Sequence, residues 1–116
     1  MQITEIAKVC HEANRAYCET LDDWSQPRWA EAPNWQQASV TNSVKFHLAN
    51  PRAKPSRSHE EWLKEKGATG WKYGVKKDLE KQEHPCFVPY DELPETQKAK
   101  DALFVAVVNA LRHLAA

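Results

Sequence analysis

The first residues of the chain place apolar side chains at the three- and four-residue spacing of an α-helix. The apolar positions that follow this spacing are Ile6, Cys10, Ala13, Tyr17 and Leu21. The pattern predicts an amphipathic helix over residues 4–21, about five turns long. Residues 22–33 carry two prolines and two tryptophans without any periodicity. They predict an ordered loop in which Trp24 and Trp29 are packed away from water, because indole rings are large apolar groups.

A second helix is predicted between Asn34 and Asn50. Asn34 can cap the first turn, and Gln37 three residues later suits a capping box. Pro51 disfavours helical backbone in the residue before it, so the helix is expected to end at Asn50. Its buried side is expected to consist of Trp35, Ala38, Val44 and Leu48.

A polar connection and a shorter helix are predicted next. Residues 50–57 contain two prolines and three basic residues, which is typical of a mobile link. Ser58 and Glu61 form a capping box, so the helix is expected to run from there to Lys66 and to end at Gly67. The inward-facing residues of this helix are expected to be Trp62 and Leu63.

The middle of the chain predicts a small β element. Trp71 and Tyr73 lie between Gly70 and Gly74, and alternation places both rings on one face of an extended segment. Residues 86–88 form a second β-prone run, so the two segments are expected to pair as a two-stranded ribbon.

The last helix is predicted to begin near Pro94 and to be the most enclosed. Proline is tolerated in a first turn. The apolar face is broad and consists of Leu103, Phe104, Val107, Val108, Leu111 and Leu114. The whole chain, residues 1–116, is therefore expected to be one mainly α domain of about four helices with a short β ribbon, divided into residues 1–50 and 58–114.

Composition narrows the class of protein. The 16 basic residues balance 16 acidic ones, which argues against a binder of nucleic-acid polymers. The longest apolar run, residues 102–108, is far shorter than the roughly 20 residues of a membrane span. Cys10 and Cys18 would lie about 12 Å apart on one helix, too far for a disulfide. Reduced thiols and residues 1–16 without a signal-peptide pattern predict a cytoplasmic protein.

Motifs for catalysis and metal binding are not found. The five histidines are scattered, and no two lie three or four residues apart, so no metal site is predicted. Phosphate-binding glycine loops and the nucleophile elbow are missing from the sequence. Cys86 and His84 would share a strand face only if Pro85 left the strand straight. We therefore expect a protein that is not an enzyme and needs no cofactor.

A family resemblance enters between His59 and Leu114. The sequence reads Gly-Trp-x-Tyr-Gly at residues 70–74, followed by His-Pro-x-x-Val-Pro-Tyr and Asp-Glu-Leu-Pro over residues 84–94. This stretch resembles the ryanodine-receptor repeat, which occurs as tandem copies in the receptor channels and as single-copy proteins in bacteria and phages. Residues 10–15 and the second helix resemble the N-terminal half of the single-copy proteins. This chain carries one copy and no channel or membrane segment is expected in it, so nothing about calcium conduction is implied.

The resemblance implies a helical domain and a ligand-binding role, because microbial members have been suggested to sense nucleotide-derived signals. The residues compatible with such a ligand are Asn14, Arg15, Trp71, Tyr73, Lys77, Asp78 and His84. Aromatic faces can stack on a base, and cationic groups can bind phosphate.

Each of these candidates also has a structural alternative. The two rings can be core, the lysine solvated, and Asp78 a turn cap. His84 or Asn14 can bond the protein itself, and Arg15 has Glu12 and Glu19 at ion-pair spacing. A rival function is that of a protein-interaction or structural domain. A single copy is then expected to pair with itself as a homodimer, with tryptophans as interface anchors.

Overall fold

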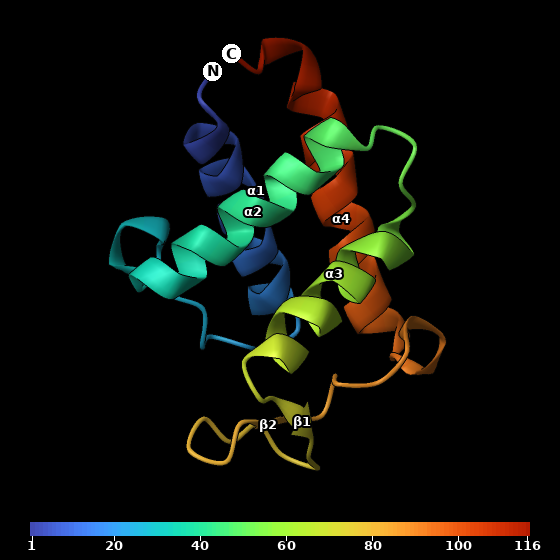
Figure 1. Cartoon of the computed structure of the whole chain (residues 1–116). Helices are drawn as coiled ribbons and strands as arrows, with labels where there is room; N and C mark the ends of the chain where they lie inside the picture. Colours follow the sequence, from blue (N-terminus) through green and yellow to red (C-terminus); the bar gives the residue numbers. More distant parts are fainter.

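Four α-helices and a short ribbon make up the fold (Figure 1). The computed structural model describes residues 1–116. The helices are α1 (Ile3–Thr20), α2 (Asn34–Ala49), α3 (Pro55–Ala68) and α4 (Glu95–Leu111). The strands are β1 (Lys72–Tyr73) and β2 (Glu83–His84), and the short 3-10 turns are η1 (Trp29–Glu31), η2 (Tyr90–Glu92) and η3 (Arg112–Leu114). The predicted fold class, mainly helical with four helices and a two-stranded ribbon, is confirmed.

The core lies where α1, α2 and α4 meet. It consists of fully or almost fully buried side chains from these three helices, namely Ile6, Ala7, Cys10, Val44 and Val108. The spacing of Ile6 and Cys10 puts both on one face of α1, as predicted. The other end of that predicted stripe differs, because Leu21 lies past the end of α1 and is 41% exposed.

The helix α4 is the central element. It packs against α1, α2 and α3, and Figure 1 shows it behind the C-terminal end of α2 and behind α3. Its broad apolar face, which predicted this position, supplies Val105 and Val108 to the buried interior. Neither α4 nor any other helix combines the length and the apolar character that a bilayer crossing requires.

Two predicted helix starts are wrong by up to one turn. Asn34 is the first residue of α2, and Pro33 occupies the position before it, so Asn34 does not cap the helix. The helix α3 begins at Pro55, which leaves Ser58 inside the first turn rather than at its cap. The fixed φ of proline suits the first helical position, and Pro55 therefore starts the helix upstream of the Ser58–Glu61 pair. The predicted mobile link is correspondingly shorter.

The predicted burial of several side chains is also wrong. Trp24 is 70% exposed, and its indole N–H donates to the Asp22 carboxylate at 2.9 Å. Trp35 is 57% exposed, and Ala38 beside it is exposed as well. The loop before α2 is instead held by His11, whose Nε2 lies 2.7 Å from the Pro27 carbonyl oxygen. With this anchor in place, the loop orders without burying Trp24.

One of the two strands in the ribbon is not the strand that the sequence predicts. The strand β1 pairs with residues 83–84 in parallel, not with residues 86–88. Residues 86–88 turn away because the Val88 N–H donates to the Cys86 carbonyl oxygen at 2.8 Å. Gly74 permits the close pairing, since a Cβ atom there would overlap the side chain of Glu83. This pairing brings β2 and its residue His84 back to the helices.

Arg112 ties the end of α2 to the end of α4. Its two terminal nitrogens donate to the carbonyl oxygens of Leu48 and His47 at 2.9 and 2.8 Å. We expect Arg112→Ala to lower the free energy of unfolding by about 1–3 kcal/mol, because two charge-assisted hydrogen bonds are lost. Arg112→Lys should recover only part of this, since an ammonium lacks the two-pronged geometry. Urea denaturation measures the difference, and full recovery by lysine would contradict the account.

Candidate functional site

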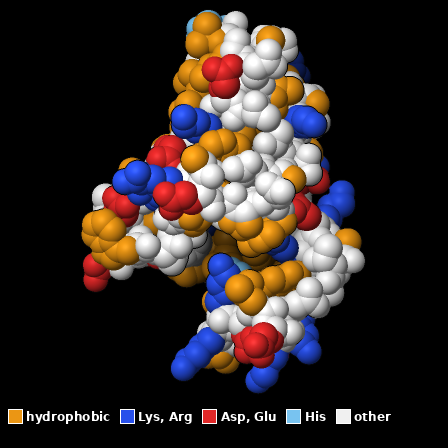
Figure 2. Space-filling model, turned by 90° about the vertical axis from the view of Figure 1, so that its left-hand side faces the viewer, with side chains coloured by type: hydrophobic (Ala, Val, Ile, Leu, Met, Phe, Trp, Pro, Cys, Tyr) orange, Lys and Arg blue, Asp and Glu red, His pale blue; other side chains and the backbone are white.

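A cavity of about 330 Å³ opens between the four helices and the ribbon. Figure 2 shows a hollow above the ribbon end of the molecule, with hydrophobic side chains inside and Lys or Arg side chains at its edge. Its size is within the range of small-molecule pockets, roughly 300–1,000 Å³. The cavity is therefore large enough for part or all of a small ligand.

Each of three helices lines the cavity with one stripe at helical spacing. From α4 the stripe consists of Gln97, Lys100, Asp101 and Phe104. From α2 it consists of Gln36, Ser39, Val40 and Ser43, and from α1 of Cys10 and Asn14. Residues three and four apart share a face of a helix. The walls therefore follow directly from how the helices are rotated when they pack on the core.

The end of α3 places Trp71 at the cavity. Gly70 has a φ of 96°, a left-handed conformation that glycine adopts without steric cost. The Trp71 N–H donates to the Lys66 carbonyl oxygen at 3.0 Å, and the Gly70 N–H to that of Gly67 at 3.2 Å. This pair of bonds is a Schellman motif. It reverses the chain and brings the Trp71 indole back beside the last turn of α3.

Lys66 lies against two indole rings. Its Nζ atom is 4.8 Å from the ring centre of Trp35 and 5.7 Å from that of Trp71. Both distances are within the range of a cation–π contact. Trp35 extends from the start of α2 and stays largely exposed while it lines the cavity. Two aromatic faces and a cation are thus available to a ligand at the same place.

Three lysines converge on the cavity from three different elements. Lys66 comes from α3, Lys77 from the loop between the strands and Lys100 from α4. None of the three belongs to an ion pair of the structure. Opposed to them is a single carboxyl group in the lining, that of Asp101. The balance of charge therefore favours an anionic ligand.

His84 presents a neutral donor to the cavity. Burial, with added repulsion from Lys77 and Lys66, lowers the pKa of His84 to about 4. Its Nδ1 atom accepts the Cys86 backbone N–H at 2.9 Å, so the ring proton of the neutral form is on Nε2. The ring stands edge-on to Trp62, with 5.1 Å between ring centres. The imidazole is therefore held in one orientation.

The thiols at the cavity have little nucleophilic character. Burial raises the pKa of Cys10 to about 12 and also raises that of Cys86. A thiol, rather than the reactive thiolate, is then the form present near neutral pH. No group of three or more His, Cys, Asp or Glu side chains is arranged to hold a metal ion. The indoles, polar side chains and lysines of the lining can stack on a ligand, form hydrogen bonds with it and attract its charge.

The family model described as the RyR domain matches residues 34–116 of this chain. The chain belongs to the RyR domain family. The match begins at the first residue of α2 and includes α3, the ribbon and α4. It extends the resemblance to residues 59–114 toward the N-terminus, so most of the cavity lies within the matched region.

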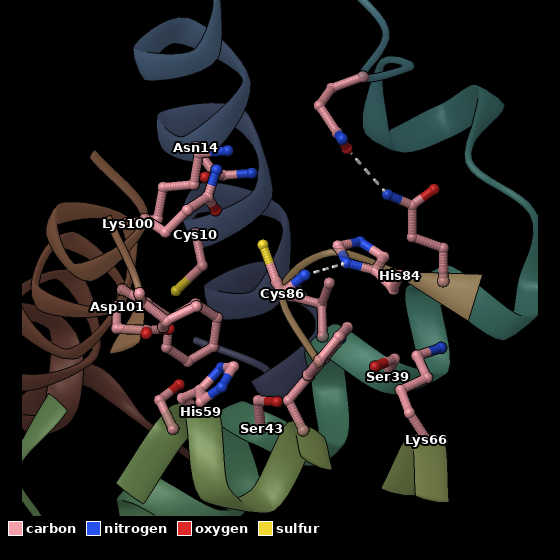
Figure 3. A pocket seen from close by; sticks show the side chains of 18 of the residues that line it. Cys10, Asn14, Ser39, Ser43, His59, Lys66, His84, Cys86, Lys100 and Asp101 are labelled. Carbon is pink, nitrogen blue, oxygen red and sulfur yellow. Dashed lines mark hydrogen bonds between the residues drawn. The ribbon is translucent and has the colours of Figure 1, made fainter. Parts of the chain in front are cut away.

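The fold brings four of the predicted site residues to the cavity. Asn14, Trp71, Lys77 and His84 all line it. The Asn14 amide makes no hydrogen bond within the protein, and Figure 3 shows it near Lys100 at one end of the cavity. These four residues come from four separate segments of the chain.

The other three predicted residues lie outside the lining of the RyR domain. Arg15 pairs with Glu12 at 3.0 Å and with Glu19 at 3.3 Å, which is the alternative that the sequence itself offered. Tyr73 is 55% exposed on β1. The Asp78 carboxylate accepts the backbone N–H groups of Glu80 and Lys81 at 3.0 and 3.1 Å. Asp78 therefore caps a turn, as its structural alternative predicted.

Sequence reasoning missed several residues that line the cavity of the RyR domain. The missed side chains with the clearest binding chemistry are Trp35, Lys66, Lys100 and Asp101. One signal was present in the sequence. Lys100 and Asp101 are three and four residues after Gln97 and directly precede the apolar face of α4. A polar stripe of this kind beside a buried helix face is compatible with a cavity wall as well as with a solvated surface.

Proposed function

We propose that this RyR domain binds a small nucleotide-derived anion and does not catalyse a reaction. The observation that carries the proposal is the joint presence of two indole rings and three unpaired lysines around one open cavity. A nucleotide combines a flat base with phosphate groups, and these are the two parts that aromatic faces and lysines bind.

The contacts of such a ligand follow from the lining. The base stacks on Trp71 or Trp35, and Lys66 then shifts from the rings to a phosphate oxygen. Lys77 and Lys100 attract further phosphate oxygens, and the Nε2–H of His84 donates a hydrogen bond. A polymer is a poor candidate, because the chain as a whole has no basic excess.

The biological role we infer is that of a sensor or a sequestering module. The single-copy members of bacteria and phages that this chain resembles support that role, and sequestration would deprive a host defence system of its signal. Cys10, Cys18 and Cys86 are free thiols, which suits the reducing cytoplasm.

Thermal melting with a nucleotide panel tests the proposal. Adenine nucleotides, cyclic dinucleotides and NAD derivatives are added singly, and at least one should raise the unfolding midpoint. A ligand at about a hundred times its Kd stabilises the native state by about 2.7 kcal/mol. Absence of a shift with every member of the panel would reject a nucleotide ligand.

Charge-removing variants then locate the binding site. We expect Lys77→Ala and Lys100→Ala each to raise the Kd of the bound nucleotide roughly tenfold or more, because each removes a charge-assisted contact. Lys76→Ala is the matched control, since Lys76 is the exposed neighbour of Lys77 and lies outside the lining. Isothermal titration measures all three. Equal effects of Lys76→Ala and Lys77→Ala would show that only overall charge matters.

A second candidate function is protein interaction, including pairing with a second copy. The loop between the strands exposes Val75 at 81% and Leu79 at 65%, beside Tyr73 at 55%. Exposed apolar side chains that gather in one segment are typical of interaction surfaces. Light scattering separates this candidate from the first. A dimer that is disrupted by Val75→Ser, together with no response to the nucleotide panel, favours interaction.

A further inference from the structure

Asp101 is a cavity residue whose polar group has no hydrogen-bond partner in the protein. It supplies the only carboxyl group in the lining, and it comes from α4 between Gln97 and Phe104 on the same stripe. Its side chain makes no hydrogen bond and no ion pair, although Lys100 is its neighbour in sequence and Ser58 lines the same cavity. Asp101 stays only partly exposed, so water replaces these partners incompletely.

Asp101 lies away from Lys66 and His84 in the cavity, although Lys100 is its neighbour. Figure 3 shows Asp101 on the same side of the cavity as Lys100 and His59, and Lys66 and His84 on the other side. A phosphate placed near Lys66 and Lys77 would therefore leave Asp101 facing another part of the same ligand. That part must provide hydrogen-bond donors, because a carboxylate is an acceptor. A cationic group is disfavoured there, since Lys100 beside Asp101 already supplies a positive charge.

We propose that Asp101 recognises the neighbouring 2′- and 3′-hydroxyls of a ribose, so that the cavity selects ribonucleotides over deoxyribonucleotides. This inference rests on the proposed function and specifies its ligand. Two adjacent hydroxyls supply two O–H donors, which match the two oxygens of one carboxylate. The ribose also lies between base and phosphate, so it can reach Asp101 while the base contacts an indole and the phosphate contacts lysine.

The unfavourable burial of the charged Asp101 carboxylate in the ligand-free protein supports a binding role. Burial raises the pKa of Asp101 to about 7, and attraction to Lys100 offsets this only in part. A structural carboxylate normally finds a partner that stabilises its charged form. Asp101 accepts no hydrogen bond in the protein, whereas a ribose would provide two donors. The residue thus weakens the ligand-free fold and gains its partners on binding.

Isothermal titration with ADP and 2′,3′-dideoxy-ADP at pH 8 tests the inference. The wild-type protein is expected to bind ADP at least about tenfold more tightly, because the dideoxy compound leaves the carboxylate without donors. Asp101→Asn should bring the two affinities to within about threefold of each other. Its affinity for dideoxy-ADP should stay within about threefold of the wild-type value. Asp91→Asn is the control, because it removes the charge of an exposed aspartate outside the lining.

The outcomes separate this inference from the proposed function. Equal binding of the two nucleotides by the wild-type protein would overturn the ribose assignment and leave nucleotide binding intact. A preference for ADP that survives Asp101→Asn would also overturn it. Failure of ADP and of every panel nucleotide to bind would reject the proposed function, and this inference with it.

Discussion

Asparagine in place of Asp101 should raise the thermal midpoint of the ligand-free protein at pH 8 by roughly 5–10 °C, the shift expected for about 1–2 kcal/mol in a domain of this size. The pKa of Asp101 is raised to about 7 by burial, whereas that of an unfolded aspartate is about 3.9. The folded state therefore prefers the protonated form. The contribution of Asp101 to the free energy of unfolding is fully present below about pH 4 and is lost as the pH rises to about 7.

The measurement is the unfolding midpoint of both proteins from pH 4 to pH 8. The gain from Asp101→Asn should be largest at pH 8 and should shrink toward zero near pH 4, where both side chains are neutral. The ionisable groups around Asp101 are Lys100 on α4, His59 on α3, Tyr90 on η2 and Cys86, so the comparison between variants removes their common contribution. A loss of stability at pH 8 would show that Asp101 has a structural partner after all.

Alanine in place of Ile6 should lower the free energy of unfolding by about 2–5 kcal/mol. Ile6 is fully buried between α1, α2 and α4 and contributes to the same cluster as Val44 and Val108. The truncation removes apolar contacts and leaves a hollow that the packed helices cannot fill. Small domains have a total stability of roughly 5–15 kcal/mol, so this loss is a large part of the total.

Urea denaturation followed by circular dichroism measures this loss. Val9→Ala is the control, because Val9 is on the same helix and is 38% exposed. It should change the unfolding free energy by less than about 1 kcal/mol. Equal losses for the two variants would mean that the cluster around Ile6 is not the main source of stability.

The sequence predicts those parts of the fold that local periodicity determines. The broad apolar face of α4 predicts the central position of this helix. The apolar stripe of α1 predicts that Ile6 and Cys10 lie on its buried side. Local periodicity does not determine where a helix starts when two nearby residues both suit its first turn. Pro55 and Ser58 both suit a first turn, and the choice between them depends on the path of the preceding loop.

The cavity was harder to predict than the helices. Trp71 and His84 could be named because glycine and proline beside them mark unusual local structure. Lys66, Lys100 and Asp101 look like ordinary surface residues of helices, and only the packing of α3 against α4 brings them together. Arg15 differs from these residues, because the sequence makes it a candidate for ligand binding whereas in the structure it forms an ion pair with Glu12 one turn away.

One wall of the cavity comes from α1, which precedes the region matched by the family. A graft of residues 34–116 into another protein would carry the three lysines and the three indoles of the lining but would leave Asn14 behind. It would also uncover the face of Val44 and Val108 that α1 shields. Residues outside the segment that the family model matches therefore help to shape the cavity, and a chain that began at residue 34 would lack this wall.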